Sequence, residues 1–424
     1  MRYRGVVRSL FYGFFIKRFR IDFLAQTLQQ PMKHNFLKSK DIAIIAYGET
    51  KLEKRTSKSP YELATEVASE LFAKTNLKPR DIDGFATNNT LSDCANPFYS
   101  NFCAEYLGIT PRWLQTTDIG GCSPIGNVAR ASAAISAGFC ETVLLINSDA
   151  PTSKLSQSYG GYRDEFLEPT GIQGPPGAFG LLMHQYIEKY DFDFRALGAL
   201  AVAQREGAIL NDNAYEKNRF AISIEDYLNS RMVSSPLRLL DSVMFCDGAN
   251  GLIITSTEHA KKLGCRKMIH PVAYSEITNF NAYSMTPDIT ETGFSVVGPE
   301  ALNKAGLTTS DIRMFHPYDD FLIAEMLQLE QIGFCQRGEG SQFLLNNDLS
   351  FKGNFPINTG GGQISAGQPG LAGGGLNLVE AIRQMFDEGG ARQVKQVDNA
   401  MVTGIGVIPY GKNWGSSSVL ILEK

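Results

Sequence analysis

The sequence predicts an α/β fold built from two duplicated halves. Apolar strand-like runs alternate with helical patterns up to about residue 150. A short motif from this part recurs late in the chain, and a Gly-, Pro- and Tyr-rich segment separates the two copies. Alternating strands and helices indicate a mostly parallel sheet with helices on its faces.

The first half supplies five elements. Their predicted order is strand 41–50, helix 59–77, strand 81–89, helix 126–138 and strand 141–149. In the first helix, Ser59 suits the N-cap and Pro60 the first helical position. The second helix consists mainly of small residues and ends at Gly138, a residue typical of helix C-termini.

The repeat joins LKPRDIDGF (77–85) to LTTSDIRMF (307–315). Each copy is followed by a glycine-rich loop, a helix and an apolar strand, which favours an internal duplication. Residues 151–240 interrupt the pattern, and we expect them to form a loop domain over one face of the sheet. The expected division is a basic N-terminal extension without regular order at 1–40, a first half at 41–265 and a second half at 266–424.

Composition excludes several classes of function. The net charge of −4 over 424 residues, without a basic stripe in the body of the chain, argues against nucleic-acid binding. Seven cysteines occur without a CxxC pair and five histidines are dispersed, so we expect no metal site. This cysteine usage fits a reducing, cytoplasmic compartment.

Four segments carry residues suited to chemistry. Cys122 follows a Gly-Gly turn at the start of a helix, where a thiolate is favoured, although a single cysteine is more often a buried filler. Tyr318, Asp319 and Asp320 form a turn after a strand, although an aspartate there can simply cap the next helix. The third segment is a glycine-rich loop around Gln368, and the fourth is a turn at Gly404 and Gly406.

The order of these segments resembles the thiolase superfamily from about Asp41 to the end of the chain. It is most similar to the sterol-carrier-protein-X thiolases and the lipid-transfer-type thiolase-like proteins. The resemblance rests on GGCSP (120–124), DGANGLIIT (247–255), FHPYDDF (315–321) and the glycine-rich loop before EAIRQM. It implies a layered α-β-α-β-α core with the inserted loop domain, and coenzyme A thioesters as substrates.

The chain departs from thiolases at each catalytic position. The resemblance places the nucleophile on Gly121, with Cys122 one residue later, and leaves the choice between them open. The first thiolase His corresponds to Tyr318 and the second to Gln368, while the second Cys has no counterpart near Gly404. The implied substrate-binding glycines are Gly121, Gly361, Gly362, Gly367, Gly404 and Gly406.

These departures favour a reaction without an acyl-enzyme. A Claisen reaction needs a thiolate and a titrating base, and Gln368 does not titrate, although its amide can donate a hydrogen bond to a thioester oxygen. We expect retro-aldol cleavage of a β-hydroxyacyl-CoA, with Tyr318 moving the proton and Asp319 orienting it. Thiolase-like retro-aldolases resemble this chain in having Tyr at the position of Tyr318. Two alternatives stay open: an acyltransferase with Cys122 as nucleophile, and a non-catalytic acyl-CoA- or lipid-binding subunit.

The resemblance also implies partners. It implies a homodimer, and for the retro-aldolases a small partner protein with a zinc ribbon and an OB-fold. We expect no covalently bound cofactor, with the coenzyme A thioester entering as substrate. The loop domain is expected to shape the acyl pocket, with Tyr159, Tyr162, Phe166 and Phe179 as candidate lining residues.

Overall fold

The computed structural model describes residues 35–154, 168–172, 174–281, 288–406 and 414–424. Residues 37–424 form one compact unit. Most of the predicted N-terminal extension, together with Tyr159, Tyr162 and Phe166, lies outside the described residues. Among the described helices, none has the length and apolar character needed to cross a membrane.

The first sheet has five strands in the order β1-β7-β4-β2-β3. Their bounds are β1 Ile42–Glu49, β2 Gly84–Asn88, β3 Trp113–Thr117, β4 Thr142–Asp149 and β7 Gly248–Ser256. Two helices, α2 (Pro60–Thr75) and α3 (Tyr99–Tyr106), cover its outer face, and α10 (Thr257–Lys262) follows β7. Helix α2 begins as predicted, because Ser59 accepts a hydrogen bond from the Glu62 N–H in a capping box.

The second sheet has four strands in the order β8-β11-β10-β9. Their bounds are β8 His270–Thr278, β9 Phe315–His316, β10 Asn399–Gly406 and β11 Ser416–Glu423. Helices α11 (Phe294–Ala305) and α12 (Leu322–Ile332) lie on its outer side, with α13 (Gly340–Asn346) beyond them.

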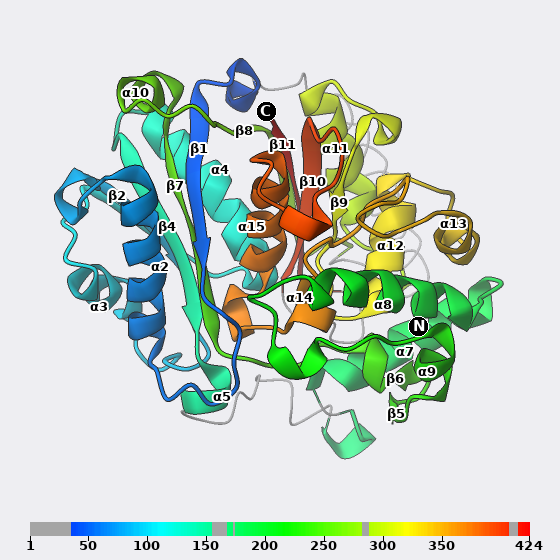
Figure 1. The fold of residues 1–424 in the computed structure, drawn as a ribbon. Helices are drawn as coiled ribbons and strands as arrows, with labels where there is room; N and C mark the ends of the chain where they lie inside the picture. The colour runs from blue at the N-terminus through cyan, green and yellow to red at the C-terminus, as the bar shows by residue number, and fades with distance from the viewer. Residues whose placement is uncertain (1–34, 155–167, 173, 282–287, 407–413) are drawn as a thin grey trace, which may run out of the picture. The chain divides into compact units, whose positions relative to one another are not determined.

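Two helices fill the space between the sheets (Figure 1). They are α4 (Ser123–Ser136) and α15 (Gly374–Met385), one from each half of the chain. One apolar cluster joins them to both sheets, with fully buried members such as Val128, Leu145, Ile382 and Val402. The result is the predicted α-β-α-β-α layering, with apolar side chains on both faces of each helix in the middle layer.

The duplication is visible in the strand order and in one local motif. Within each sheet the last strand of the half, β7 or β11, lies between the first strand and the remaining strands. In both copies of the sequence repeat, an aspartate side chain closes a short 3₁₀ turn: Lys78 N donates to Asp81 and Thr308 N donates to Asp311, at 2.8 and 2.7 Å. The repeated residues are therefore those that build this turn before β2 and before β9.

The expectation of mostly parallel sheets is wrong. Strand β7 is antiparallel to both of its neighbours, and so is β11. For β11 the reason is its short connection to β10, since consecutive strands joined this way pair antiparallel. Parallel pairing is confined to β2 with β3 and β4, and to β9 with β10.

The inserted segment packs beside the second sheet. Its described elements are α5 Pro151–Lys154, α7 Gly174–Lys189, α8 Phe194–Ile209, α9 Ile224–Asn229, β5 Met232–Ser234 and β6 Leu237–Arg238. The short helix α14 (Gly362–Ala366) of the glycine-rich loop lies between α8 and α15. Phe179 of α7 is buried and stacks on Phe321 with ring centroids 4.2 Å apart, so it belongs to the core.

Candidate active site

Tyr318 lies in the turn that joins β9 to α12. Its backbone N–H donates to Thr403 Oγ1 of β10 at 2.8 Å, and its carbonyl oxygen accepts from Gln328 Nε2 of α12 at 2.8 Å. Gln328 in turn accepts a hydrogen bond from the Thr403 hydroxyl. The sheet and the helix therefore fix the Tyr318 backbone, which leaves the side chain few orientations.

The Tyr318 ring lies directly on Gly121. A Cβ atom at residue 121 would lie 2.1 Å from Tyr318 Cε2 and 2.5 Å from the Tyr318 hydroxyl oxygen. Folded proteins essentially never contain so close a carbon contact. Residue 121 therefore has no room for a nucleophilic side chain while Tyr318 holds this position.

Cys122 is fully buried at the N-cap position of α4. Burial raises the pKa of its thiol far above the usual range, and the neighbouring Ser418 side chain offsets this only partly. Desolvation of the thiolate therefore outweighs the stabilisation that the sequence suggested for a helix N-terminus. This environment suits a buried filler and disfavours a nucleophile.

The two glycines of β10 lie against the turn that contains Cys122. A Cβ at Gly404 would lie 2.7 Å from Cys122 Cα, and a Cβ at Gly406 would lie 1.9 Å from the Ile119 carbonyl oxygen. Both positions therefore need glycine because the backbone of another segment approaches them.

Asp319 is fully buried, and its carboxylate holds the glycine-rich loop. Its Oδ2 accepts from the N–H groups of Gln363 and Ile364 at 2.7 and 3.1 Å, and its Oδ1 accepts from Asn377 Nδ2 at 3.0 Å. A Cβ at Gly362 would lie 2.1 Å from Asp319 Oδ2. These bonds run to the loop and not to the Tyr318 hydroxyl, so the geometry does not give Asp319 the expected role of orienting Tyr318.

The carboxyl group beside the Tyr318 hydroxyl belongs to Asp320. The charge of Asp320 acts on the Tyr318 phenol more strongly than that of Asp319, and Gln368 Nε2 donates to Asp320 Oδ1. Sequence analysis placed Asp320 in this turn but did not select it. Its position two residues after Tyr318 is the only signal the sequence offered, because a helix cap would have the same pattern.

Burial shifts the pKa values of this pair. It raises the pKa of Asp320 to about 7, while hydrogen bonds from Tyr318 and Gln368 act in the opposite direction. Burial, and then the neighbouring Asp320, raise the pKa of Tyr318 well above its usual range. The phenol is therefore protonated at neutral pH, and Asp320 is the member of the pair that changes its charge there.

Both side-chain N–H groups of Gln368 are engaged within the protein. Its Nε2 also donates to Gln363 Oε1 at 3.1 Å, so both amide hydrogens have protein acceptors. Its backbone is fixed as well, since Gln368 N donates to the Met244 carbonyl and Cys246 N donates to the Gln368 carbonyl. The hydrogen bond expected from Gln368 to a thioester oxygen is therefore made to Asp320 instead.

Other glycines of the loop are enclosed by the protein itself. A Cβ at Gly361 would lie 2.6 Å from the Ala208 Cβ of α8, and a Cβ at Gly367 would lie 2.8 Å from the Cys246 sulfur. Both have φ values above +100°, which side chains rarely adopt. Their predicted contact with substrate stays a prediction, because close packing within the chain already accounts for these glycines.

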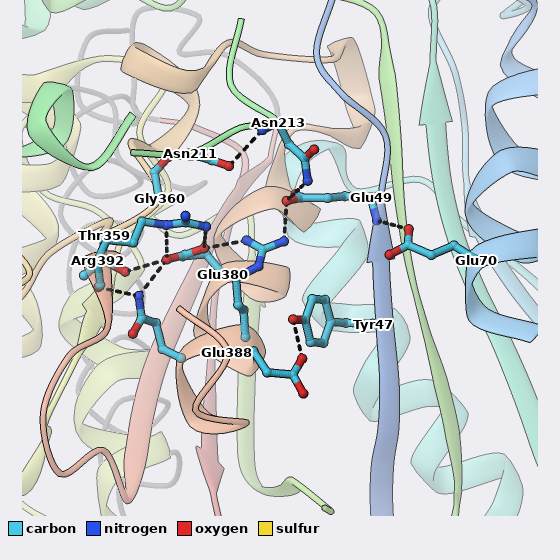
Figure 2. Close-up of polar contacts among 12 residues, drawn as sticks. Tyr47, Glu49, Glu70, Asn211, Asn213, Thr359, Gly360, Glu380, Glu388 and Arg392 are labelled. Atoms are coloured by element: carbon cyan, nitrogen blue, oxygen red, sulfur yellow. Dashed lines mark hydrogen bonds and ion pairs between the residues drawn. The ribbon is translucent and has the colours of Figure 1, made fainter. Parts of the chain in front are cut away.

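A buried ionic network lies behind the loop (Figure 2). Glu380 of α15 accepts from Arg392, from Arg383 and from Thr359 Oγ1, with Arg392 making two bonds of 3.0 and 2.9 Å. Arg383 also donates to Glu49 of β1. The cavity beside these residues measures about 10 Å³, room for a single water. The network thus ties the loop to the first sheet and leaves no space for a substrate.

No cluster of three or more His, Cys, Asp or Glu side chains suited to a metal ion occurs in the described part of the chain. The chemistry that this turn supports is proton transfer between oxygen atoms. Tyr318 and Asp320 supply the donor and acceptor, and Gln368 holds the carboxylate.

Comparison with known proteins agrees with this architecture. Residues 275–424 match the family described as thiolase C-terminal domain-like. The 17-hydroxy-3-oxo-4-pregnene-20-carboxyl-CoA lyase of Mycobacterium tuberculosis is 29% identical over 391 residues, which cover 87% of this chain and 97% of the lyase. The steroid side-chain-cleaving aldolase of Thermomonospora curvata is also 29% identical, over 87% of this chain and 96% of the aldolase.

Two solved structures have the same fold as this chain. The Ltp2-ChsH2(DUF35) aldolase superposes with a TM-score of 0.79 at 27% identity, covering 91% of this chain and 98% of that chain. A monomeric SCP2-thiolase-like protein from Mycobacterium smegmatis shares the fold, with a TM-score of 0.69 at 20% identity over 91% of this chain and 77% of its own. The chain is therefore similar over most of its length to CoA lyases and aldolases, its C-terminal part matches a thiolase family, and it shares the fold of an SCP2-thiolase-like protein.

Proposed function

We propose that this protein is a thiolase-superfamily lyase that cleaves the carbon–carbon bond next to an acyl-CoA thioester by a retro-aldol reaction. The observation that carries the proposal is a tyrosine ring in the place where the thiolase nucleophile is expected. Tyr318 fills the space over Gly121, and the neighbouring thiol of Cys122 is buried with a raised pKa. The site has a proton-transfer group where a thiolase has an acyl acceptor.

The reaction needs a proton-transfer group and a thioester. The substrate is a β-hydroxyacyl-CoA, whose hydroxyl proton passes to the Tyr318 oxygen as the phenol's own proton leaves. The bond between the α- and β-carbons breaks, the β-carbon becomes a carbonyl, and the electron pair forms the thioester enolate. Return of a proton to the α-carbon releases the shortened acyl-CoA, so atoms and charge balance without a covalent intermediate.

The relatives support this reaction. The two curated relatives are named as a carboxyl-CoA lyase and a side-chain-cleaving aldolase, and the superposed structure is named as an aldolase. An acyltransferase using Cys122 is disfavoured by the burial of that thiol. A non-catalytic subunit that binds acyl-CoA or lipid is the outcome left if no turnover is observed.

The first probe is the compound in the relative's name, 17-hydroxy-3-oxo-4-pregnene-20-carboxyl-CoA. We expect equal amounts of a carbonyl product and a shortened acyl-CoA, with Tyr318→Phe lowering kcat at least about 100-fold and Cys122→Ala changing it little. Deuterium uptake at the α-carbon of acetyl-CoA or propionyl-CoA in D₂O reports the enolate without depending on the acyl chain. Absence of both cleavage and exchange, alone and with a zinc-ribbon/OB-fold partner protein present, refutes the proposal.

Two partners are proposed with this function. The aldolase structure carries ChsH2(DUF35) in its name, which supports a small partner protein here as well. A homodimer is supported by exposed apolar side chains on α3 and the edge strand β3, namely Phe98, Phe102, Tyr106 and Leu114. Sedimentation of the wild type and of Phe102→Glu tests the dimer: loss of a dimer in the variant is expected, and a monomeric wild type contradicts it.

We propose a cytoplasmic location. All seven cysteines are unpaired in the structure, as expected of a protein kept in a reducing compartment. Cell fractionation with an antibody to the protein tests this, and recovery in a secreted fraction contradicts it.

A further inference from the structure

We propose that Asp320 takes the proton that leaves Tyr318 during cleavage, and that Gln368 is the positioning residue that holds Asp320 for this step. The inference rests on the proposed function and goes beyond it. It assigns the second proton-transfer group of a site in which the resemblance to thiolases leaves only an amide. The site thus pairs a tyrosine with an aspartate instead of two histidines.

The two neighbouring aspartates of the turn differ in how far their carboxyl groups are engaged by the protein. Asp319 is fully buried and accepts three close hydrogen bonds from the glycine-rich loop and α15. Asp320 is half-buried, and its carboxyl group contacts Tyr318 and Gln368. Only Asp320 is both next to the phenol and open on one side.

Tyr318 cannot keep the substrate proton. Its phenol is already protonated at neutral pH, because burial and the neighbouring carboxylate destabilise a phenolate. When its oxygen accepts the substrate proton, its own proton must leave at the same time. Asp320 is the carboxyl group whose charge acts most strongly on the Tyr318 phenol.

The step balances as a relay. The substrate O–H bond breaks and a new Tyr318 O–H bond forms, while the original Tyr318 O–H bond breaks and an Asp320 O–H bond forms. After carbon–carbon cleavage, the proton returns along the same path to the enolate α-carbon. Asp320 therefore ends each cycle as a carboxylate, and no other reactant is consumed.

Gln368 lies where its amide can hold the Asp320 carboxylate in place. An N–H donor aimed at Asp320 Oδ1 stabilises the charged form and fixes its orientation, which an acceptor or an apolar side chain would not do. Backbone bonds to Met244 and Cys246 keep residue 368 in place. Gln368 does not titrate, unlike the thiolase histidine to which it corresponds, and instead it holds a titrating carboxylate at Asp320.

The charged and titratable groups around the pair set its pH dependence. On the same turn, the Asp319 carboxyl faces Asp320, and Glu325 of α12 acts on Asp319. From α4, the Cys122 thiol faces Tyr318. The segment 242–246 contributes backbone bonds to this site, such as Val243 N to the Asp320 carbonyl. Among the residues that the structure describes, no cation acts on Asp320, and burial is the largest influence on its titration.

The test is the pH profile of kcat/KM with the steroid-CoA probe, supported by α-carbon deuterium exchange. The wild type should lose activity as the pH falls through about 7, where Asp320 becomes protonated. Asp320→Asn should lower activity at least about 100-fold and remove that acid limb. Gln368→Leu should fold normally and shift the limb to higher pH, with activity recovering in alkaline buffer. The exposed Asp191, changed to Asn, is the matched control and should leave activity and profile unchanged.

The outcomes separate this inference from the function on which it rests. If the wild type cleaves the probe and Asp320→Asn retains activity within about threefold with the same acid limb, the relay is wrong and the lyase stands. If Gln368→Leu leaves the limb in place, Gln368 does not act through Asp320 and its assignment is wrong. If the wild type neither cleaves nor exchanges, the proposed function fails and this inference fails with it.

Discussion

The contact between Gly121 and Tyr318 gives the sharpest stability prediction. Gly121→Ala places a Cβ 2.1 Å from Tyr318 Cε2, whereas ordinary carbon contacts begin at 3.4 Å. The ring must shift by more than an ångström, although Thr403 and Gln328 hold the Tyr318 backbone. Overpacking of this kind costs about 1–3 kcal/mol, so Gly121→Ala should lower the free energy of unfolding by that amount.

The second part of the prediction uses Tyr318→Ala as background. The three atoms nearest to the added Cβ all belong to Tyr318, so removing the ring removes the clash. Gly121 is not among the residues with positive φ, and at such positions Gly→Ala usually stabilises by about 0.4–1 kcal/mol. Gly121→Ala should therefore be neutral or stabilising in this background.

A double-mutant cycle by urea unfolding measures the coupling between the two sites. We expect an interaction energy of about 1–3 kcal/mol or somewhat more. It is the cost of the clash in the presence of Tyr318 plus the stabilisation that Gly121→Ala gives in its absence. Equal costs of Gly121→Ala in both backgrounds would refute the reasoning, because Tyr318 would then not occupy the space at residue 121. Activity gives an independent check, since displaced Tyr318 should also lose turnover in the single variant.

Two further predictions concern the buried carboxylates. Glu380→Gln removes the charge that pairs with Arg383 and Arg392, leaves Arg392 without its buried carboxylate and should lower the free energy of unfolding by about 3–5 kcal/mol. These arginines depress the pKa of Glu380, so its ion pairs stabilise the folded state at pH values above the unfolded-state pKa of about 4.5. This stabilisation is lost as the pH falls below that value. Thermal unfolding of the variant should therefore depend less on pH in that range. Asp319→Asn forces one amide N–H toward the donors Gln363 N or Asn377 Nδ2 and should cost about 1–3 kcal/mol in urea unfolding. An unchanged unfolding midpoint for either variant would show that its hydrogen bonds do not hold the loop.

Much of the fold could be predicted because its signals are local. The capping box at Ser59 and the aspartate-closed turns at Asp81 and Asp311 each involve residues three apart in sequence. The direction of β7 could not be predicted, since a buried strand is a continuous apolar run in either orientation. Pairing of this kind depends on contacts between residues about a hundred or more positions apart.

The residues of the candidate site could be predicted better than the hydrogen-bond partners of those residues. Sequence analysis identified Tyr318, Asp319 and Gln368, and the structure brings all three into one region. It could not tell which carboxylate lies beside the phenol, because neighbouring residues of a turn point in different directions that depend on tertiary packing. Gln368 was expected to donate to substrate, and the structure shows its amide donating to Asp320 and Gln363.

The central claim is that cleavage proceeds without an acyl-enzyme. The direct measurement is intact-protein mass spectrometry of samples quenched during turnover of the steroid-CoA probe, followed by peptide mapping around Cys122. The account predicts an unmodified protein mass while carbonyl product and shortened acyl-CoA accumulate. An acyl mass increment on Cys122 that forms and decays at the rate of turnover would contradict it.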